Sequence, residues 1–327
     1  FVALMGPSGS GKTTLLNLIG GLDTPSSGEI DVAGERIDRM GGGQLSGWRS
    51  RNVGYVFQFY NLMPALTAQK NVELPLLLTK LSGAQRKRNA EIALTLVGLA
   101  DRTKHKPNEL SGGQQQRVGL ARALVINPKV LLMDEPLSNL DAKLRVDLRR
   151  ELREIQQAMN ISTVYVTHDQ EEALAMSDLV CVMYGGVIQQ AAPPWEVYNN
   201  PTNRFVASFV GANNFLTLDR AGTKTSISGN DVALPQADAV SPQRKIVAAI
   251  RPEAISVGPA ASSDHDRIEL PVIIRQVSFT GREMNVAAVL SSGEEIEAIT
   301  KPSPAIIALE PNQKTTFSWR AADTQLF

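Results

Sequence analysis

The first two thirds of the chain combine short apolar runs with helical periodicity. Residues 130–133 form an apolar run that fits a strand buried on both faces of a parallel sheet, and Pro136 stops it. Further along, apolar residues recur at helical spacing and predict the core-facing side of one helix: Leu144, Leu148, Leu152, Ile155 and Met159. This mixture of strands and helices predicts an α/β fold.

A mainly helical segment interrupts this pattern at about residues 64–118. Pro64 and Thr67 open it, and the basic residues 85–88 fit the solvated start of a helix. We expect that helix to continue through three apolar residues, Ile92, Leu96 and Leu99. The segment is therefore predicted to be a small helical insert.

Beyond Gly211 the chain changes to short strands separated by Gly, Pro, Asn and Asp. Examples of these predicted strands are residues 245–250, 270–277 and 284–290. Several strands at such short spacing favour a small β-barrel or sandwich. We therefore predict two domains, an α/β domain at residues 1–210 and an all-β domain at residues 211–327.

Composition excludes some classes of protein. Lys and Arg number 33 and Asp and Glu number 33, so the net charge indicates neither nucleic-acid binding nor attraction to an anionic membrane. A single cysteine excludes an intrachain disulfide, and Cys181 fits the interior of a strand. The sequence has no signal peptide and no apolar run near the ~18 residues of a membrane helix. We expect a cytoplasmic protein that reaches a membrane only through a partner.

Two carboxylates, Asp134 and Glu135, directly follow the apolar run at residues 130–133. Ligands of open α/β sheets bind at the carboxyl ends of the strands. An aspartate at this place can hold Mg²⁺, and the adjacent glutamate can orient an attacking water. Taken alone, however, residues 131–136 favour the plainer interpretation of a strand followed by an acidic turn.

Residues 6–13 match the pattern G-x-x-x-x-G-K-[ST] at every fixed position, between a predicted strand and a predicted helix. Glycines let backbone N–H groups surround phosphates, and the helix N-terminus adds positive potential. Lys12 would reach the β- and γ-phosphates, and the Thr13 hydroxyl would ligate Mg²⁺. We expect a nucleotide site here rather than a loop that only caps a helix.

A second glycine-rich helix start occurs at residues 110–114. Its serine and two glycines precede an apolar helix, which makes another anion-binding N-terminus. One nucleotide does not need two phosphate-binding loops in one site. We therefore expect the second loop to bind a nucleotide held by another copy of the chain.

With these motifs the sequence resembles the ATPases of ABC transporters, which implies a P-loop NTPase fold. Six motifs occur in the order of that family: the Walker A loop at 6–13, the Q-loop residue Gln58, the LSGGQ signature at 110–114, Walker B at 130–135, the D-loop at 138–141 and the switch residue His168. The short insert distinguishes the chain from chromosome-maintenance relatives, which carry long coiled coils at this point.

The resemblance also implies roles for individual residues. Glu135 would act as general base or position water, His168 would contact the γ-phosphate, and Gln58 would sense metal and water. Mg²⁺ would be held by Thr13, Gln58 and Asp134. ATP would be bound by Gly6, Pro7, Ser8, Gly9, Ser10, Gly11, Lys12, Thr13 and Thr14. The opposite protomer would add Ser111, Gly112, Gly113 and Gln114, and the D-loop would contribute Asp141.

The resemblance extends to partners. The region around Asn214 and Arg251 resembles the OB-like regulatory domain, or TOBE domain, of ATPases that import maltose-type sugars, polyamines, ferric iron or sulfate. It implies a homodimer joined through ATP, located at the cytoplasmic side of the cell membrane beneath permease subunits. A solute-binding protein would complete the complex, with no nucleic acid.

Two alternatives stay open. From Leu15 to about Leu110 the sequence is more similar to lipoprotein-release and macrolide-efflux ATPases, which keeps an exporter open, whereas from Leu137 onward it resembles importers. The second alternative to an importer, from a different class of protein, is a soluble ABC ATPase that acts on nucleic acid or ribosomes. The neutral charge and the C-terminal domain disfavour it.

The chain begins inside an apolar strand at Phe1, without an initiator methionine, so we expect a fragment that has lost its natural N-terminus. Family members stack adenine on an aromatic residue upstream of the Walker A loop, which this chain does not contain. We predict weaker ATP binding than in a chain with that front restored. Nucleotide titration of both chains measures the difference, and equal affinities would contradict it.

Overall fold

The computed structural model describes residues 1–221, 224–234, 246–259 and 266–327. This described part divides into two compact units, Phe1–Thr202 and Asn203–Phe327. The sequence analysis placed the boundary at residue 210 instead. The difference is helix α9 (Arg204–Phe209), where the carbonyl oxygen of Ala207 accepts a hydrogen bond of 2.6 Å from the Asn213 side chain of the second unit.

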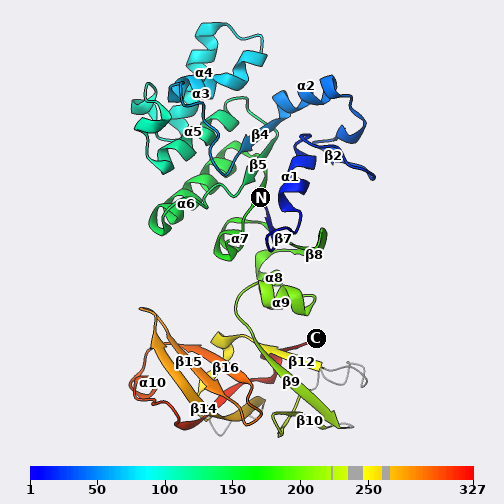
Figure 1. Ribbon diagram of the computed structural model, residues 1–327, viewed down its shortest axis with the longest axis vertical. Coiled ribbons are helices and arrows are strands. Elements are labelled where there is room, and N and C mark those ends of the chain that lie inside the picture. The colour runs from blue at the N-terminus through cyan, green and yellow to red at the C-terminus, as the bar shows by residue number, and fades with distance from the viewer. Residues whose placement is uncertain (222–223, 235–245, 260–265) are drawn as a thin grey trace. The chain divides into compact units, whose positions relative to one another are not determined.

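The first unit is built on one central sheet. Its strands are β1 (Val2–Met5), β4 (Val53–Val56), β5 (Val130–Asp134), β6 (Ser162–Val166), β7 (Leu179–Tyr184) and β8 (Val187–Ala192). Their order across the sheet is β4-β5-β6-β1-β7-β8, with β8 antiparallel at the edge and the others parallel (Figure 1). The predicted strand at residues 130–133 is confirmed, because all four residues are buried in β5.

Helices and a small hairpin surround this sheet. They are α1 (Lys12–Ile19), β2 (Asp31–Val32), β3 (Glu35–Arg36), the 3₁₀ helix η1 (Ile37–Arg39), α2 (Gly42–Asn52), α6 (Ala142–Met159), α7 (Gln170–Met176) and α8 (Pro194–Asn199). The predicted apolar face of α6 is confirmed, since Leu148 and Leu152 are buried and its other apolar residues pack against the same core. Among the described residues, no helix combines the length and apolar composition needed to cross a membrane.

The predicted helical insert forms a separate group of helices beside β4 (Figure 1). It contains α3 (Ala68–Glu73), η2 (Leu74–Leu78), α4 (Gly83–Leu96), η3 (Ala100–Arg102), η4 (Pro107–Glu109) and α5 (Gly112–Leu124). Helix α4 buries Ala90, Ala93 and Leu94. Of the three apolar residues that marked this helix in the sequence, Ile92 and Leu96 are 59% and 45% exposed. The third, Leu99, is buried and lies beyond the last residue of the helix, so the prediction that the helix continues to Leu99 was wrong. The insert therefore presents apolar side chains at its surface.

The second unit is a pair of antiparallel sheets after α9. The first sheet, in the order β11-β10-β9-β12-β18, contains β9 (Asn214–Ala221), β10 (Lys224–Ile227), β11 (Asn230–Val232), β12 (Ile246–Ile250) and β18 (Thr324–Leu326). The second, in the order β13-β17-β14-β15-β16, contains β13 (Ser256–Val257), β14 (Arg267–Phe279), β15 (Met284–Val289), β16 (Glu295–Thr300) and β17 (Lys314–Arg320). Short helices complete this unit: η6 (Pro252–Ala254), α10 (Pro304–Ile307) and η7 (Ala321–Asp323).

The predicted strands of the second unit correspond to β12, β14 and β15, although Lys245, the first residue of the predicted strand 245–250, lies outside the described residues. Side chains from both sheets form one core around Phe317 and Trp319. The buried Asn214 links the sheets, because its amide nitrogen donates to the carbonyl oxygen of Glu297 (2.9 Å) and its oxygen accepts from the N–H of Glu297 (2.7 Å). Such paired bonds satisfy a buried amide and fix the two sheets together.

A buried carboxylate holds α7 onto α6 and β6 in the first unit. Oε2 of Glu172 accepts hydrogen bonds of 2.7 Å from the hydroxyls of Tyr165 and Thr167. Its other oxygen lies 3.8 Å from Arg145 and 3.6 Å from Arg149, both on α6. This network fixes the segment between β6 and α7 from two sides.

Glu172→Ala leaves two hydroxyls and two guanidinium groups without their shared carboxylate. Removing one partner of a buried charged network costs about 3–5 kcal/mol. We expect the melting temperature of the first unit, measured by calorimetry, to fall by roughly 6–20 °C. Glu171→Ala is the matched control, because the side chain of Glu171 is 87% exposed, and it should shift the transition by less than about 3 °C. Equal shifts in both variants would contradict this role.

Candidate active site

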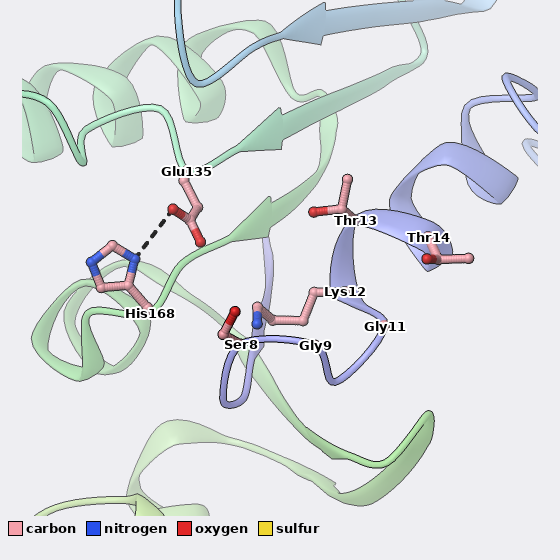
Figure 2. A pocket seen from close by; sticks show the side chains of 8 residues that line it. All are labelled: Ser8, Gly9, Gly11, Lys12, Thr13, Thr14, Glu135 and His168. Carbon is pink, nitrogen blue, oxygen red and sulfur yellow. Dashed lines mark ion pairs between the residues drawn. The ribbon is translucent and has the colours of Figure 1, made fainter.

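A cavity of about 480 Å³ lies at the carboxyl edge of the central sheet (Figure 2). Its walls are Ser8, Gly9, Gly11, Lys12, Thr13, Thr14, Glu135 and His168. These residues come from the loop after β1, from the end of β5 and from the segment after β6. The parallel sheet thus brings together three segments that are far apart in the sequence.

The loop between β1 and α1 needs glycine for steric reasons. A Cβ atom on Gly6 would lie 2.3 Å from the carbonyl oxygen of Met183 on β7. Gly9 (φ +78°) and Gly11 (φ +93°) have left-handed backbones, which side chains other than glycine rarely adopt. The loop therefore curls tightly at the start of α1, where backbone N–H groups can surround an anion.

The ammonium group of Lys12 is folded back onto this loop. It donates hydrogen bonds to the carbonyl oxygens of Gly6 (2.8 Å) and Pro7 (3.0 Å). Burial lowers the pKa of Lys12, while the nearby carboxylates of Glu135 and Asp134 act in the opposite direction. A phosphate entering the cavity would meet a cation already held at the loop.

Thr13, which lines the cavity, forms an oxygen-donor pair with Asp134, the last residue of β5. The Thr13 hydroxyl donates to Oδ1 of Asp134 at 3.3 Å. Burial raises the pKa of Asp134. A divalent cation bound beside this carboxylate would act in the opposite direction and favour its charged form. A hydroxyl and a carboxylate are hard oxygen ligands, which fit Mg²⁺.

Glu135 is the point at which the segments converge. Its Oε2 atom accepts a hydrogen bond from the Gln58 amide (3.1 Å) and lies 3.3 Å from Nδ1 of His168. The backbone of Glu135 is left-handed (φ +44°), and its N–H donates to the carbonyl oxygen of Val166 (3.0 Å). Such a conformation at a residue other than glycine costs about 1–3 kcal/mol and is typical of active sites.

The cap of α7 is Asp169 and not His168. The Asp169 carboxylate accepts from the backbone N–H of Glu172 at 3.1 Å, and Arg145 and Arg149 also donate to it. The His168 side chain is 62% exposed and points toward Glu135 (Figure 2). The structure therefore separates the capping role from the position beside the carboxylate.

The residues expected to act on a second nucleotide lie away from the cavity walls. Ser111 caps α5 by accepting from the N–H of Gln114 (3.3 Å), and Gly113 packs against Leu144 of α6. Ser111 and Gly112 are exposed. Asp141 is the exposed cap of α6, where it accepts from the N–H of Leu144 (2.9 Å). Of residues 110–114, Ser111 and Gly112 are thus presented outward, whereas Leu110 and Gly113 are buried.

Sequence reasoning did not single out Asn139, whose side-chain amide donates to the carbonyl oxygen of Gln58 at 3.0 Å. Its neighbour Ser138 donates to the carbonyl oxygen of Glu135 at 3.0 Å. Both residues belong to the D-loop motif at 138–141, and their place in that motif was the available signal. These two bonds connect the D-loop to the backbones of Gln58 and Glu135, whose side chains are hydrogen-bonded to each other.

Comparisons with known proteins bear on the family of this chain. The family model described as ABC transporter matches residues 1–138, and the TOBE domain model matches residues 248–327. The TOBE match confirms the expected OB-like C-terminal domain.

Two relatives span most of the chain. The Fe(3+) ions import ATP-binding protein FbpC of Fusobacterium nucleatum is 42% identical over 300 residues, which are 91% of this chain and 78% of the relative. The trehalose import ATP-binding protein SugC of Mycobacterium tuberculosis is 40% identical over 315 residues, 95% of this chain and 77% of that protein.

A solved structure is similar to the first unit's fold. It is the ATP-binding cassette MJ0796 as a dimer in a post-hydrolysis state bound to ADP and Pi, with a TM-score of 0.54 and 39% identity. The alignment covers 59% of this chain and 85% of that one. From the site geometry and these comparisons together, the chain belongs to the ABC transporter ATPases: it is an ATP hydrolase with a P-loop nucleotide-binding fold and a C-terminal TOBE domain.

Proposed function

We propose that this chain is the ATP-hydrolysing subunit that powers solute import through permease subunits in a membrane. One observation carries the ATPase part: Gln58, Glu135 and His168 meet at the cavity that contains Lys12. The import part is supported by FbpC and SugC, which are import proteins by name and match more than nine tenths of the chain, including its TOBE domain.

In this proposal the glycine loop binds the phosphates of ATP. Lys12 exchanges its bonds to the carbonyl oxygens of Gly6 and Pro7 for phosphate oxygens. Ser8, Gly9, Gly11, Thr13 and Thr14 line the rest of the phosphate site, and the start of α1 contributes its backbone N–H groups. Thr13, Asp134 and Gln58 would hold Mg²⁺, which neutralises phosphate charge when it is bound.

Glu135 then orients the water that attacks the γ-phosphate and accepts its proton. His168 lies beside Glu135, next to one of its carboxylate oxygens, so it holds Glu135 in place (Figure 2). Because His168 also lines the cavity, it would contact the γ-phosphate. Gln58 donates to Oε2 of Glu135, which restrains the carboxylate further. Positioning of this kind, together with charge neutralisation, is the main source of catalysis in phosphoryl transfer.

The site is completed by a second copy of the chain. Ser111, Gly112, Gly113 and Gln114 lie at the N-terminus of α5, where Ser111 and Gly112 are exposed, and would close on the γ-phosphate held by the partner. The dimeric MJ0796 cassette supports this arrangement. ATP would therefore join two chains head to tail, and its hydrolysis would release them.

The complex would lie at the cytoplasmic side of the cell membrane, with the chain peripheral to two permease subunits and a solute-binding protein. The solute would be a sugar, a polyamine, iron or a similar compound. The exporter alternative is less well supported, because the import relatives cover both units of the chain. Capture of the tagged chain from native membranes, followed by mass spectrometry, tests this directly. A permease with a solute-binding protein is the expected result, and an efflux membrane protein would refute import.

Glu135→Gln removes the proton acceptor but keeps the shape of the side chain. We expect ATP binding to persist, turnover to fall by about 10²–10⁴-fold, and an ATP-bound dimer to accumulate. Size-exclusion chromatography with Mg-ATP measures the dimer. Adding Ser111→Arg to this variant is the control, because it blocks the exposed α5 N-terminus and should abolish the dimer while nucleotide binding remains. A dimer of unchanged amount in the double variant would contradict the shared site.

A further inference from the structure

The side chain of Arg122, on α5, donates hydrogen bonds to the turn that follows Gln58. Nη2 of Arg122 donates to the carbonyl oxygen of Tyr60, and Nη1 donates to the carbonyl oxygen of Asn61, both at 2.6 Å. The two acceptors are successive, and the planar guanidinium fork matches that spacing. The contact joins residues about sixty positions apart in the sequence. Arg122 lies on α5 of the helical insert, and its acceptors lie in the segment that follows β4.

This turn needs support because its backbone is strained. Tyr60 (φ +61°) and Asn61 (φ +45°) are both left-handed, and neither is a glycine. Each such residue costs about 1–3 kcal/mol unless its surroundings hold it there. Inside the turn, the N–H of Tyr60 donates to the carbonyl oxygen of Phe57 (3.2 Å). The Arg122 fork supplies the additional bonds at the two strained carbonyls.

Gln58 lies at the beginning of the same turn. Its side-chain amide donates to Glu135, and its carbonyl oxygen accepts from Asn139 (3.0 Å). The position of the amide against Glu135 therefore depends on where the turn is held. A continuous path of bonds runs from Arg122 through the turn to Gln58 and Glu135.

Helix α5 carries both Arg122 and the last three residues of the signature, Gly112–Gln114. Ser111 is its N-cap and Arg122 lies in its last turn, about 16 Å away along the axis. A helix of this length moves as one body, so a shift of its N-terminus also moves the Arg122 fork. Gly112 lies against the same turn, since a Cβ there would be 3.5 Å from the Tyr60 hydroxyl oxygen.

We propose that Arg122 is a positioning residue that transmits contact between the signature and the partner's nucleotide to Gln58 and Glu135 of its own chain. The proposal rests on the shared ATP site described above. Arg122 does not touch the reacting atoms. It sets the turn at residues 58–61 and thereby the hydrogen bond that restrains the carboxylate. Nucleotide binding at one site of the dimer would then change the positions of Gln58 and Glu135 at the other site.

Arg122→Met tests this in the full chain, with kcat and KM for ATP measured separately. A displaced Gln58 should lower kcat by about 10- to 100-fold, while KM and the binding of a non-hydrolysable ATP analogue change less than about threefold. Arg122→Lys keeps the charge but can reach only one carbonyl, and it should give an intermediate kcat. Arg117→Met is the matched control on the same helix, because it removes bonds to the carbonyl of Val97 and to Glu151 but none to the turn. It should leave kcat within about twofold.

A double-mutant cycle separates positioning from stability. On a Gln58→Ala background, Arg122→Met should lower kcat by less than about twofold, because its effect passes through Gln58. An equal loss with and without Gln58, or an unchanged kcat in Arg122→Met, overturns the proposal. If the methionine variant is unfolded at the assay temperature, Arg122→Lys decides, and its wild-type kcat would overturn the proposal. Absence of turnover in the wild-type chain would instead refute the proposed function.

Discussion

The bond between the backbone N–H of Glu135 and the carbonyl oxygen of Val166 is the constraint on which the site depends. It holds Glu135 in a left-handed conformation as β5 leaves the sheet, so the side chain turns toward the cavity instead of continuing the strand. Without that turn the carboxylate could not meet Gln58 and His168, which follow the ends of β4 and β6. A hydrogen bond between the backbones of two neighbouring parallel strands thus sets the geometry of the proposed site.

Ion pairs and hydrogen bonds fix the segments on both sides of this hydrogen bond. Glu172 and Asp169 anchor the segment after β6 to the arginines of α6, and this fixes the backbone that carries His168. Asn139 and Arg122 hold the turn after β4 at two different carbonyl oxygens, those of Gln58 and Tyr60. The carboxylate is therefore restrained from elements that belong to both the sheet and the helical insert. Rigid support of this kind keeps catalytic groups within productive distances.

Local pattern predicted much of the fold and the residues that line the cavity. The buried strand at residues 130–133, the glycine loop before α1 and the apolar face of α6 each depend on neighbours in sequence, and the structure has all three. The rest arises from contacts between distant residues. Ile92 and Leu96 are exposed because the packing of the insert selects Ala90, Ala93 and Leu94 instead. The left-handed Glu135, Tyr60 and Asn61 carry no glycine signal, and an arginine inside a helix does not reveal which carbonyls it binds.

The folded-back Lys12 has a consequence for how the loop selects its occupant. Since its ammonium already satisfies two carbonyl oxygens, an incoming anion competes with the loop itself and gains only the difference between two sets of bonds. A small ion such as sulfate offers little beyond that exchange. A polyphosphate chain that also extends along the backbone N–H groups and reaches the Thr13 hydroxyl would gain further contacts, so this arrangement of Lys12 favours a polyphosphate over a small anion.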